Sequence, residues 1–287
     1  MNSSFGARPS TPPTVRNLII LTVVCHILSI AATVFLQFNV VQNFGLHNWN
    51  SAYFKPWQLV SYMFLHDMSY IFLRDIGGIT HLLFNMLGLW MFGSMLERFW
   101  GAQKFIIFYF VTGIGAGLIN VFSTTILLQP MFDSAVFYMN NPGYNLFEHF
   151  VSNYLPGSYD NEGVNEFLKV WFNDPLNPGY IKESVQIVNQ VTDLRLNTPT
   201  VGASGSIYGL LLAFGVLFPN SVIMLLIPPI PLKAKYFVLI FGGMELLLGL
   251  RNNLEDNVGH FAHLGGMLFG ILLILLWKKQ AKNKNVV

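Results

Sequence analysis

The sequence predicts an all-α membrane protein with six membrane-spanning helices and a large polar segment between the third and the fourth. Hydrophobic residues make up 53% of the 287 positions, and charged residues make up only 10%. Soluble domains contain about 25% charged residues. The apolar residues fall into six separate stretches, as expected when each helix of about 20 residues crosses a bilayer once.

Composition also narrows the possible partners and cofactors. The formal net charge of +2 is too small to indicate a nucleic-acid partner. Cys25 is the only cysteine, so no internal disulfide can form. No metal-binding cluster and no glycine-rich phosphate loop is recognisable, and we therefore predict neither a metal nor a cofactor.

The first predicted helix follows a polar tail. Residues 1–16 are rich in Ser, Thr and Pro, which predicts a disordered cytoplasmic tail. Residues 17–38 are long enough to span a membrane and lack the small-residue cleavage site of a signal peptide, so they are assigned to the first helix. Residues 39–80 mix aromatic and polar side chains, which is typical of a structured loop at the membrane interface.

Five more apolar stretches are assigned to the second to sixth helices. They are residues 81–96, 103–128, 204–218, 234–250 and 261–277. We therefore predict one membrane domain over residues 17–278, followed by a basic cytoplasmic tail over residues 279–287.

The polar segment between the third and fourth helices has a composition of its own. Residues 129–198 contain eight acidic and three basic residues, a net charge of −5. Residues 144–154 and 181–191 could form amphipathic helices. A connection of this length favours a folded subdomain over a bare loop.

The distribution of positive charge predicts the orientation. Ten of the sixteen Lys and Arg residues lie in the two tails, the second-to-third turn and the fourth-to-fifth turn. Because positively charged loops stay in the cytoplasm, both termini are predicted to be cytoplasmic and the acidic segment to lie outside. We expect a multi-pass protein of a bacterial inner (plasma) membrane. The second, fourth and sixth helices would then begin at the outer face, near His81, Ser204 and His263.

A serine and a histidine at two of these helix starts predict a catalytic pair. A serine hydroxyl is a weak nucleophile unless an adjacent base takes its proton, and His263 is the best candidate base for Ser204. Gly266 and Gly270 are four residues apart and form a small-residue face that permits close helix approach. Further small residues lie beside the serine: Gly202, Gly205 and Gly209.

Polar residues at the start of the second helix predict an oxyanion hole. The i,i+4 spacing puts His81 and Asn85 on one helix face, and both side chains can donate hydrogen bonds. The backbone amide of Ser204 would be a third donor, because the first turn of a helix leaves its amides without helical partners. Tyr208, one turn after Ser204, is expected to support the His263 ring.

Together these motifs resemble a known family. In chain order they are H-x-x-x-N (His81, Asn85), Glu97-Arg98 before Gly101, G-x-S-G (Gly202, Ser204, Gly205) followed by Tyr208, and A-H-x-x-G-x-x-x-G (Ala262, His263, Gly266, Gly270). This ordered set is similar to that of the rhomboid intramembrane serine proteases. Each motif alone is weakly specific, whereas the set spans residues 81–270.

The resemblance implies a six-helix rhomboid-like bundle that cleaves transmembrane protein substrates near their outer ends. It implies Ser204 as nucleophile, His263 as general base and acid, and His81, Asn85 and the Ser204 amide as the oxyanion hole. Two departures lie outside the motifs: about ten extra residues at 70–80, and the long connection at 129–198. Both would affect access and selection of substrates.

Two other functions stay open at this stage. A proteolytically inactive rhomboid-like chaperone or adaptor would be expected to lack Ser204 or His263. A transporter or channel would need ionisable residues along the membrane midplane, where Glu245 is the main candidate. Glu245 could face a cavity, form a hydrogen bond across helices or lie near the boundary. Four other histidines are interpreted as structural: His26, His47, His66 and His149. His260 is given no role.

Overall fold

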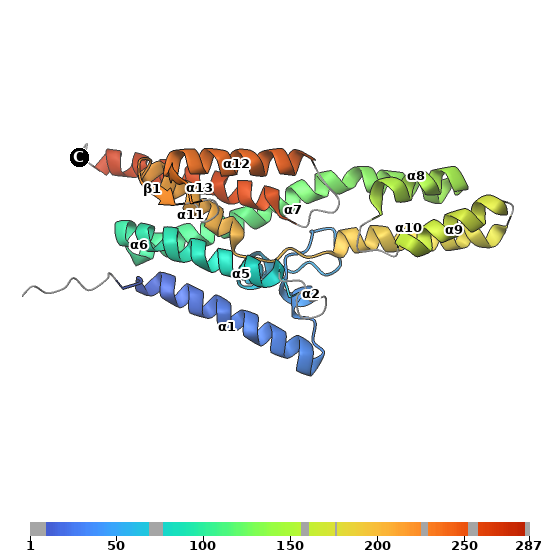
Figure 1. The fold of residues 1–287 in the computed structure, drawn as a ribbon, viewed down its shortest axis with the longest axis horizontal. Helices are drawn as coiled ribbons and strands as arrows, with labels where there is room; N and C mark the ends of the chain where they lie inside the picture. The colour runs from blue at the N-terminus through green and yellow to red at the C-terminus, as the bar shows by residue number, and fades with distance from the viewer. Residues whose placement is uncertain are drawn as a thin grey trace, which may run out of the picture.

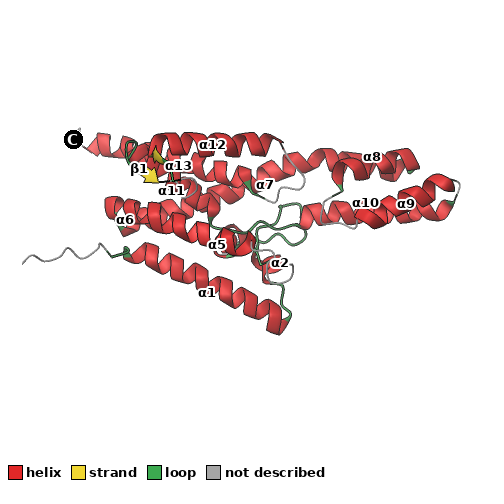
Figure 2. Ribbon diagram, in the orientation of Figure 1, coloured by secondary structure: helices red, strands yellow, loops and turns green. Residues whose placement is uncertain are grey.

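The computed structural model describes residues 10–68, 77–155, 161–175, 177–224, 229–251 and 258–284. Long helices lying side by side dominate the molecule (Figure 1 and Figure 2). Parts of the predicted tails (residues 1–9 and 285–287) and most of the 70–80 segment lie outside the described residues.

The membrane part contains α1 (Pro13–Leu36), α5 (Gly77–Gly88), the π-helical turn η2 (Leu89–Gly93), α6 (Ser94–Trp100), α7 (Ala102–Asn140), α11 (Ser204–Leu217), α12 (Ala234–Arg251) and α13 (His260–Lys284). Within the described residues, four helical stretches are long and apolar enough to cross a membrane: Pro13–Leu36, Gly78–Trp100, Ala102–Asn140 and His260–Asn283. The prediction of a helical multi-pass membrane protein is thereby confirmed.

The two other apolar stretches are also helical, but they are less suited to crossing a bilayer alone. Helix α11 has only 14 residues. Helix α12 has 18 residues and includes Lys235, Glu245 and Arg251. Six membrane crossings therefore stay a prediction, although all six predicted stretches form helices.

Several predicted helix boundaries are wrong. The first helix starts at Pro13, so residues 13–16 belong to α1 and not to a disordered tail. The sixth helix continues to Lys284, so most of the tail predicted over residues 279–287 is helical. The second helix starts at Gly77 rather than residue 81, because glycine costs only about 1 kcal/mol in a helix and does not by itself mark a boundary. The third was predicted to end at residue 128, whereas α7 continues through Pro130 to Asn140. Its 39 residues span about 58 Å, almost twice the thickness of the hydrocarbon core. Helix α7 is thus longer than one membrane crossing requires, and apolarity does not mark its end.

The acidic segment folds onto this extension of α7. It contains α8 (Tyr144–Tyr154), α9 (Asn161–Asn173) and α10 (Pro178–Asn197). The segment expected at 144–154 coincides with α8, α10 is longer than the 181–191 expected, and α9 was not predicted. These helices and the end of α7 share a separate apolar core, whose buried members are Met131, Ala135, Tyr138, Phe147, Phe150, Val151, Val164, Trp171, Val188 and Val191.

Figure 1 shows this helical unit at one end of the molecule. Helix α1 begins, and α13 ends, toward the opposite end. This arrangement is the one expected if both termini lie on one side of the membrane and the acidic segment lies on the other.

Helix α11 lies at the centre of the apolar bundle. It packs against α7, α12, α13 and η2, and most of its residues are buried. Lipid chains are as apolar as leucine, so close packing rather than the hydrophobic effect holds such helices together.

The loop between α1 and α5 is folded around a buried glutamine. It contains α2 (Val40–Phe44), α3 (Gln58–Ser61) and the 3-10 turn η1 (Tyr62–Phe64). The fully buried Gln58 side chain accepts hydrogen bonds from the amides of His47 and Lys55. It also donates to the carbonyls of Asn43 and Tyr53. A buried amide group with all of these partners fixes the loop in one conformation.

This loop holds the segment that leads into α11. Leu46 and Thr200 exchange two backbone hydrogen bonds of 2.9 Å. Thr200 Oγ1 also accepts a hydrogen bond from Asn120 Nδ2 on α7, at 2.9 Å. The start of α11 is thereby anchored on two sides.

The structure adds a short hairpin between α11 and α12 that the all-α prediction omitted. Strands β1 (Val222–Met224) and β2 (Pro231–Lys233) pair antiparallel, with Ile223 opposite Leu232. Pro231 lies in β2, and Pro228 lies outside the described residues. A two-stranded hairpin tolerates proline because its strands are both edges.

Glu97, part of the Glu-Arg motif, fastens α1 to the bundle. It is buried near the end of α6, and its two oxygens accept hydrogen bonds from the amides of Thr14 (3.0 Å) and Val15 (2.8 Å). Arg98 donates to the Ser10 carbonyl. The carboxylate thus satisfies amides that the first turn of α1 leaves free.

Candidate active site

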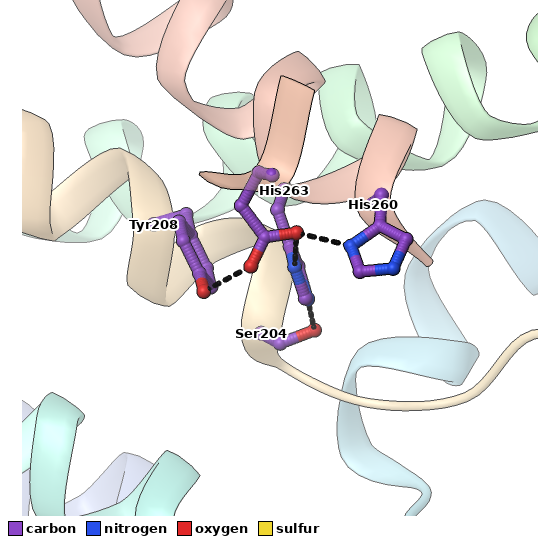
Figure 3. Close-up of polar contacts among 5 residues, drawn as sticks. Ser204, Tyr208, His260 and His263 are labelled. Carbon is purple, nitrogen blue, oxygen red and sulfur yellow. Dashed lines mark hydrogen bonds and ion pairs between the residues drawn. The ribbon is translucent and has the colours of Figure 1, made fainter. Parts of the chain in front are cut away.

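Ser204 and His263 meet at the starts of two packed helices. Ser204 is the first residue of α11, and His263 lies in the first turn of α13. The Ser204 Oγ lies 2.8 Å from His263 Nε2 (Figure 3). This is the separation at which a serine can donate its proton to a histidine base.

Glycines make this approach possible. A methyl group added at Gly266 would lie 1.9 Å from the carbonyl oxygen of Gly205, and one at Gly209 would lie 2.7 Å from Thr112 Cβ on α7. A methyl group added at Gly270 would lie 3.4 Å from the carbonyl oxygen of Gly209. Helices α11 and α13 are therefore in backbone contact along one face, as small residues allow.

Gly202 shapes the turn into α11. Its φ of +125° is a conformation that favours glycine. A side chain here would also meet the His81 ring, at 3.0 Å from Cε1. Gly202 thus allows both the turn and the approach of His81 to the serine.

Tyr208 packs flat against the imidazole of His263. The two ring centroids are 4.1 Å apart and the ring planes are within 10° of each other. The Tyr208 hydroxyl donates a hydrogen bond to Glu245 Oε1 on α12 (Figure 3). The stacked ring restricts the orientation of the His263 side chain.

The sequence left the role of Glu245 open and gave His260 no role. In the structure the Glu245 Oε2 lies 2.6 Å from His260 Nδ1 and 2.9 Å from His263 Nδ1. Of the three environments considered for Glu245, it has the hydrogen bond across helices. The sequence contains two signals of this site: an acidic residue in an apolar stretch, and two histidines three residues apart. The sequence does not connect them, because they meet only where α12 packs on α13.

The predicted oxyanion residues lie on α5. Asn85 is buried, and within the described part of the chain its Nδ2 has no hydrogen-bond partner. An unpaired buried donor costs about 1–3 kcal/mol, so such a group usually has a reason to be there. An acceptor that forms only during a reaction would satisfy it.

His66, which the sequence analysis interpreted as structural, lies next to His81. Its ring centroid is 5.3 Å from that of His81. Burial, with the nearby charges of His81 and His26, lowers the pKa of the His66 imidazole to about 3. His66 is therefore neutral at physiological pH and packs beside His81 without adding a charge.

Glu245, His260 and His263 could also hold a metal ion. One ligand atom from each lies within 4.8 Å of the others, and all three residues are buried. Two imidazoles and a carboxylate are a donor set that zinc accepts. The sequence prediction of no metal did not consider this cluster, because its members come from two helices. In the structure, Glu245 Oε2 already contacts Nδ1 of both histidines.

The family model described as Rhomboid domain matches residues 53–127 and 176–280, which is more than half of the chain. The chain belongs to the rhomboid family. Members of this family are generally intramembrane serine proteases. The matched rhomboid segments contain Ser204, His263, His81 and Asn85, and they leave residues 128–175 between them. Comparison with curated proteins gives no match.

The glycine contact gives a first testable expectation for this rhomboid protein. Gly266→Ala should destabilise the fold by about 1–3 kcal/mol, because the new methyl group overlaps the Gly205 carbonyl. Thermal unfolding in detergent measures the change. Gly243→Ala on α12 is the control, since nothing lies within 4 Å of a methyl group there. Equal stability of the two variants would contradict the proposed backbone contact.

Proposed function

We propose that this protein is an intramembrane serine endopeptidase that cleaves transmembrane protein substrates near the outer membrane face. The observation that carries the proposal is the 2.8 Å separation of Ser204 Oγ and His263 Nε2, within a fold whose family generally consists of serine proteases. An inactive adaptor has no need of this pair in hydrogen-bond contact.

The chemistry follows from the two atoms in contact. Ser204 Oγ attacks the carbonyl carbon of the scissile peptide bond while His263 Nε2 takes the serine proton. His263 then gives that proton to the leaving amine, and the C–N bond breaks to form an acyl-enzyme. Water, deprotonated by the same nitrogen, hydrolyses the ester and regenerates Ser204.

An oxyanion forms in both steps, and three donors are available for it. They are the side chains of His81 and Asn85 and the backbone amide of Ser204, which begins α11. The unpaired Asn85 Nδ2 supports this assignment, because its missing partner would be the oxyanion.

The length of α11 is consistent with a site below the membrane surface. Its 14 residues span about 21 Å, less than the hydrocarbon thickness of about 30 Å. With both termini in the cytoplasm and six crossings in a bacterial inner membrane, Ser204 would lie within the outer half of the bilayer. A substrate helix would have to unwind locally to reach it, because helical carbonyls are already hydrogen-bonded.

Loss of either member of the dyad should abolish cleavage. Ser204→Ala removes the nucleophile, and His263→Ala removes the base, so turnover of a transmembrane substrate in vesicles should fall to background. Cys25→Ala is the control and should leave turnover unchanged. Turnover near the wild-type value in either variant would exclude this dyad.

The oxyanion donors should affect rate without being essential for serine reactivity. We expect Asn85→Ala to lower kcat by up to about a hundredfold while Ser204 still reacts with a fluorophosphonate probe. His81→Ala should act in the same direction. Cleavage kinetics unchanged by both substitutions would remove α5 from the mechanism.

We assign substrate selection to the acidic helical unit. Its separate core supports this role, because α8, α9 and α10 form a defined body rather than a bare loop. Ser51 Oγ donates a 2.6 Å hydrogen bond to Asn197 Oδ1, which links the end of this unit to the loop that anchors α11. Its exposed apolar side chains, among them Phe172 at 68% exposure, could contact substrates or lipid. The alternative is an insertion without function, since long outer loops cost little entropy.

A replacement experiment separates these two roles. A Gly/Ser linker in place of residues 129–194, which keeps Asn197, should change which transmembrane substrates are cut or how fast. Labelling of Ser204 by a small probe should be unaffected. Trp171→Ala, which removes a fully buried ring from the separate core, should shift selectivity in the same direction. Unchanged cleavage across a panel of substrates would leave the insertion without a role.

A further inference from the structure

Glu245 is a buried acidic residue that the mechanism above does not use. It lies on α12, which carries no member of the proposed dyad or oxyanion hole, and it is 7% exposed. Acidic side chains within apolar helices are costly and usually mark a function. Both of its oxygens contact polar atoms of the proposed site, as described above.

We propose that Glu245 is a positioning residue for His263. It favours the imidazole with Nδ1 protonated and Nε2 free to accept, and its charge stabilises the imidazolium that forms when Ser204 loses its proton. The inference rests on the proposed function, because it assigns a role within the same reaction. It extends the pair to a chain of three groups, Ser204, His263 and Glu245.

The positions of the two imidazole nitrogens support this role. Nε2 lies 2.8 Å from Ser204 Oγ, and Nδ1 lies 2.9 Å from Glu245 Oε2. To act as a base, His263 must carry its proton on Nδ1 and leave Nε2 free. A carboxylate facing Nδ1 favours that tautomer, as the acid does in a Ser-His-Asp triad.

The charge of Glu245 acts over a short distance in an environment of low polarity. When His263 takes the serine proton, a positive charge develops 2.9 Å from a carboxylate oxygen that is screened from water. This attraction exists only after proton transfer. It therefore stabilises the transition state more than the resting state, which is the condition for a gain in kcat.

Glu245 also holds the imidazole through Tyr208. The Tyr208 ring stacks on His263, while its hydroxyl donates to Glu245 Oε1. The contact between His263 Nδ1 and Glu245 Oε2 is close but lies off the line of a good hydrogen bond. The carboxylate thus acts on His263 by its charge and by fixing Tyr208, and catalytic hydrogen bonds often align only once substrate is bound.

A purely structural role would require only the pair with His260. Their 2.6 Å contact would by itself offset much of the cost of burying Glu245. However, Glu245 Oε2 also faces His263. Glu245 Oε1 accepts a hydrogen bond from Tyr208, the residue that stacks on His263. The His260 ring itself lies edge-on to His263, with centroids 6.4 Å apart. Among the described residues, Glu245 therefore contacts the proposed base His263, the ring that stacks on it, and His260 one turn before it.

Steady-state cleavage of a model transmembrane substrate by the full chain tests the role. The assay contains EDTA, because the same three residues could bind a metal ion. Glu245→Gln keeps the size of the side chain and removes its charge, so kcat should fall by about a hundredfold or more while KM changes by less than about threefold. Glu245→Asp keeps the charge, so its kcat should be at least about tenfold higher than that of Glu245→Gln.

Glu97→Gln is a matched control, because Glu97 is also buried and hydrogen-bonded but caps α1. It should lower thermal stability and leave kcat unchanged well below the unfolding temperature. The rate of fluorophosphonate labelling at Ser204 should fall in Glu245→Gln and stay at the wild-type value in Glu97→Gln.

A folded Glu245→Gln protein with kcat within about threefold of wild type would overturn the inference and leave the proposed function standing. A wild-type protein that neither cleaves nor is labelled would overturn the proposed function itself. If Glu245→Gln does not fold, Tyr208→Phe replaces it as the test, since it keeps the stacked ring and removes the hydroxyl. Its kcat should fall by about tenfold at constant KM, and an unchanged kcat would again overturn the inference.

Discussion

The backbone contact between α11 and α13 is the constraint on which the site depends. With Gly266 against the Gly205 carbonyl, no side chain separates the two helices, and their first turns are held side by side. Ser204 and His263 meet at 2.8 Å as a consequence. Lipid supplies no hydrophobic force between helices, so this close packing both stabilises the bundle and sets the geometry of the dyad.

Three buried polar side chains of the bundle and its loop are paired with partners from other segments, which offsets the cost of burying them. Glu97 is satisfied by the free amides of α1, and Gln58 by four backbone groups of the loop before α5. Glu245 is satisfied by Tyr208 and the two histidines of α13. Asn85 Nδ2 has no partner among the described residues, and the same is true of the hydroxyls of Thr22, Ser94 and Tyr109. Asn85 differs from these three because it lies one turn after His81 on α5, where the proposed oxyanion would form.

The helical unit formed by α8, α9 and α10 shows how one long helix can belong to two cores. The first part of α7 packs on α11 and α13, and its last turns carry Met131, Ala135 and Tyr138 into a second core. One continuous helix therefore contributes side chains to both cores. The hydrogen bond from Ser51 to Asn197 adds a second link near the segment that leads to Ser204.

The sequence alone determined the membrane class, the apolar helices and the motif residues, because apolar stretches and glycine spacing are local signals. It also predicted α8, whose amphipathic pattern lies within one segment. It missed the extension of α7 to Asn140, because the helix continues without a break while its hydrophobic pattern changes from apolar on all sides to apolar on one side. Only the tertiary structure decided the partners of Glu245. The acid and the two histidines lie on different helices, and no spacing along the chain records that α12 packs its Glu245 side chain against the start of α13.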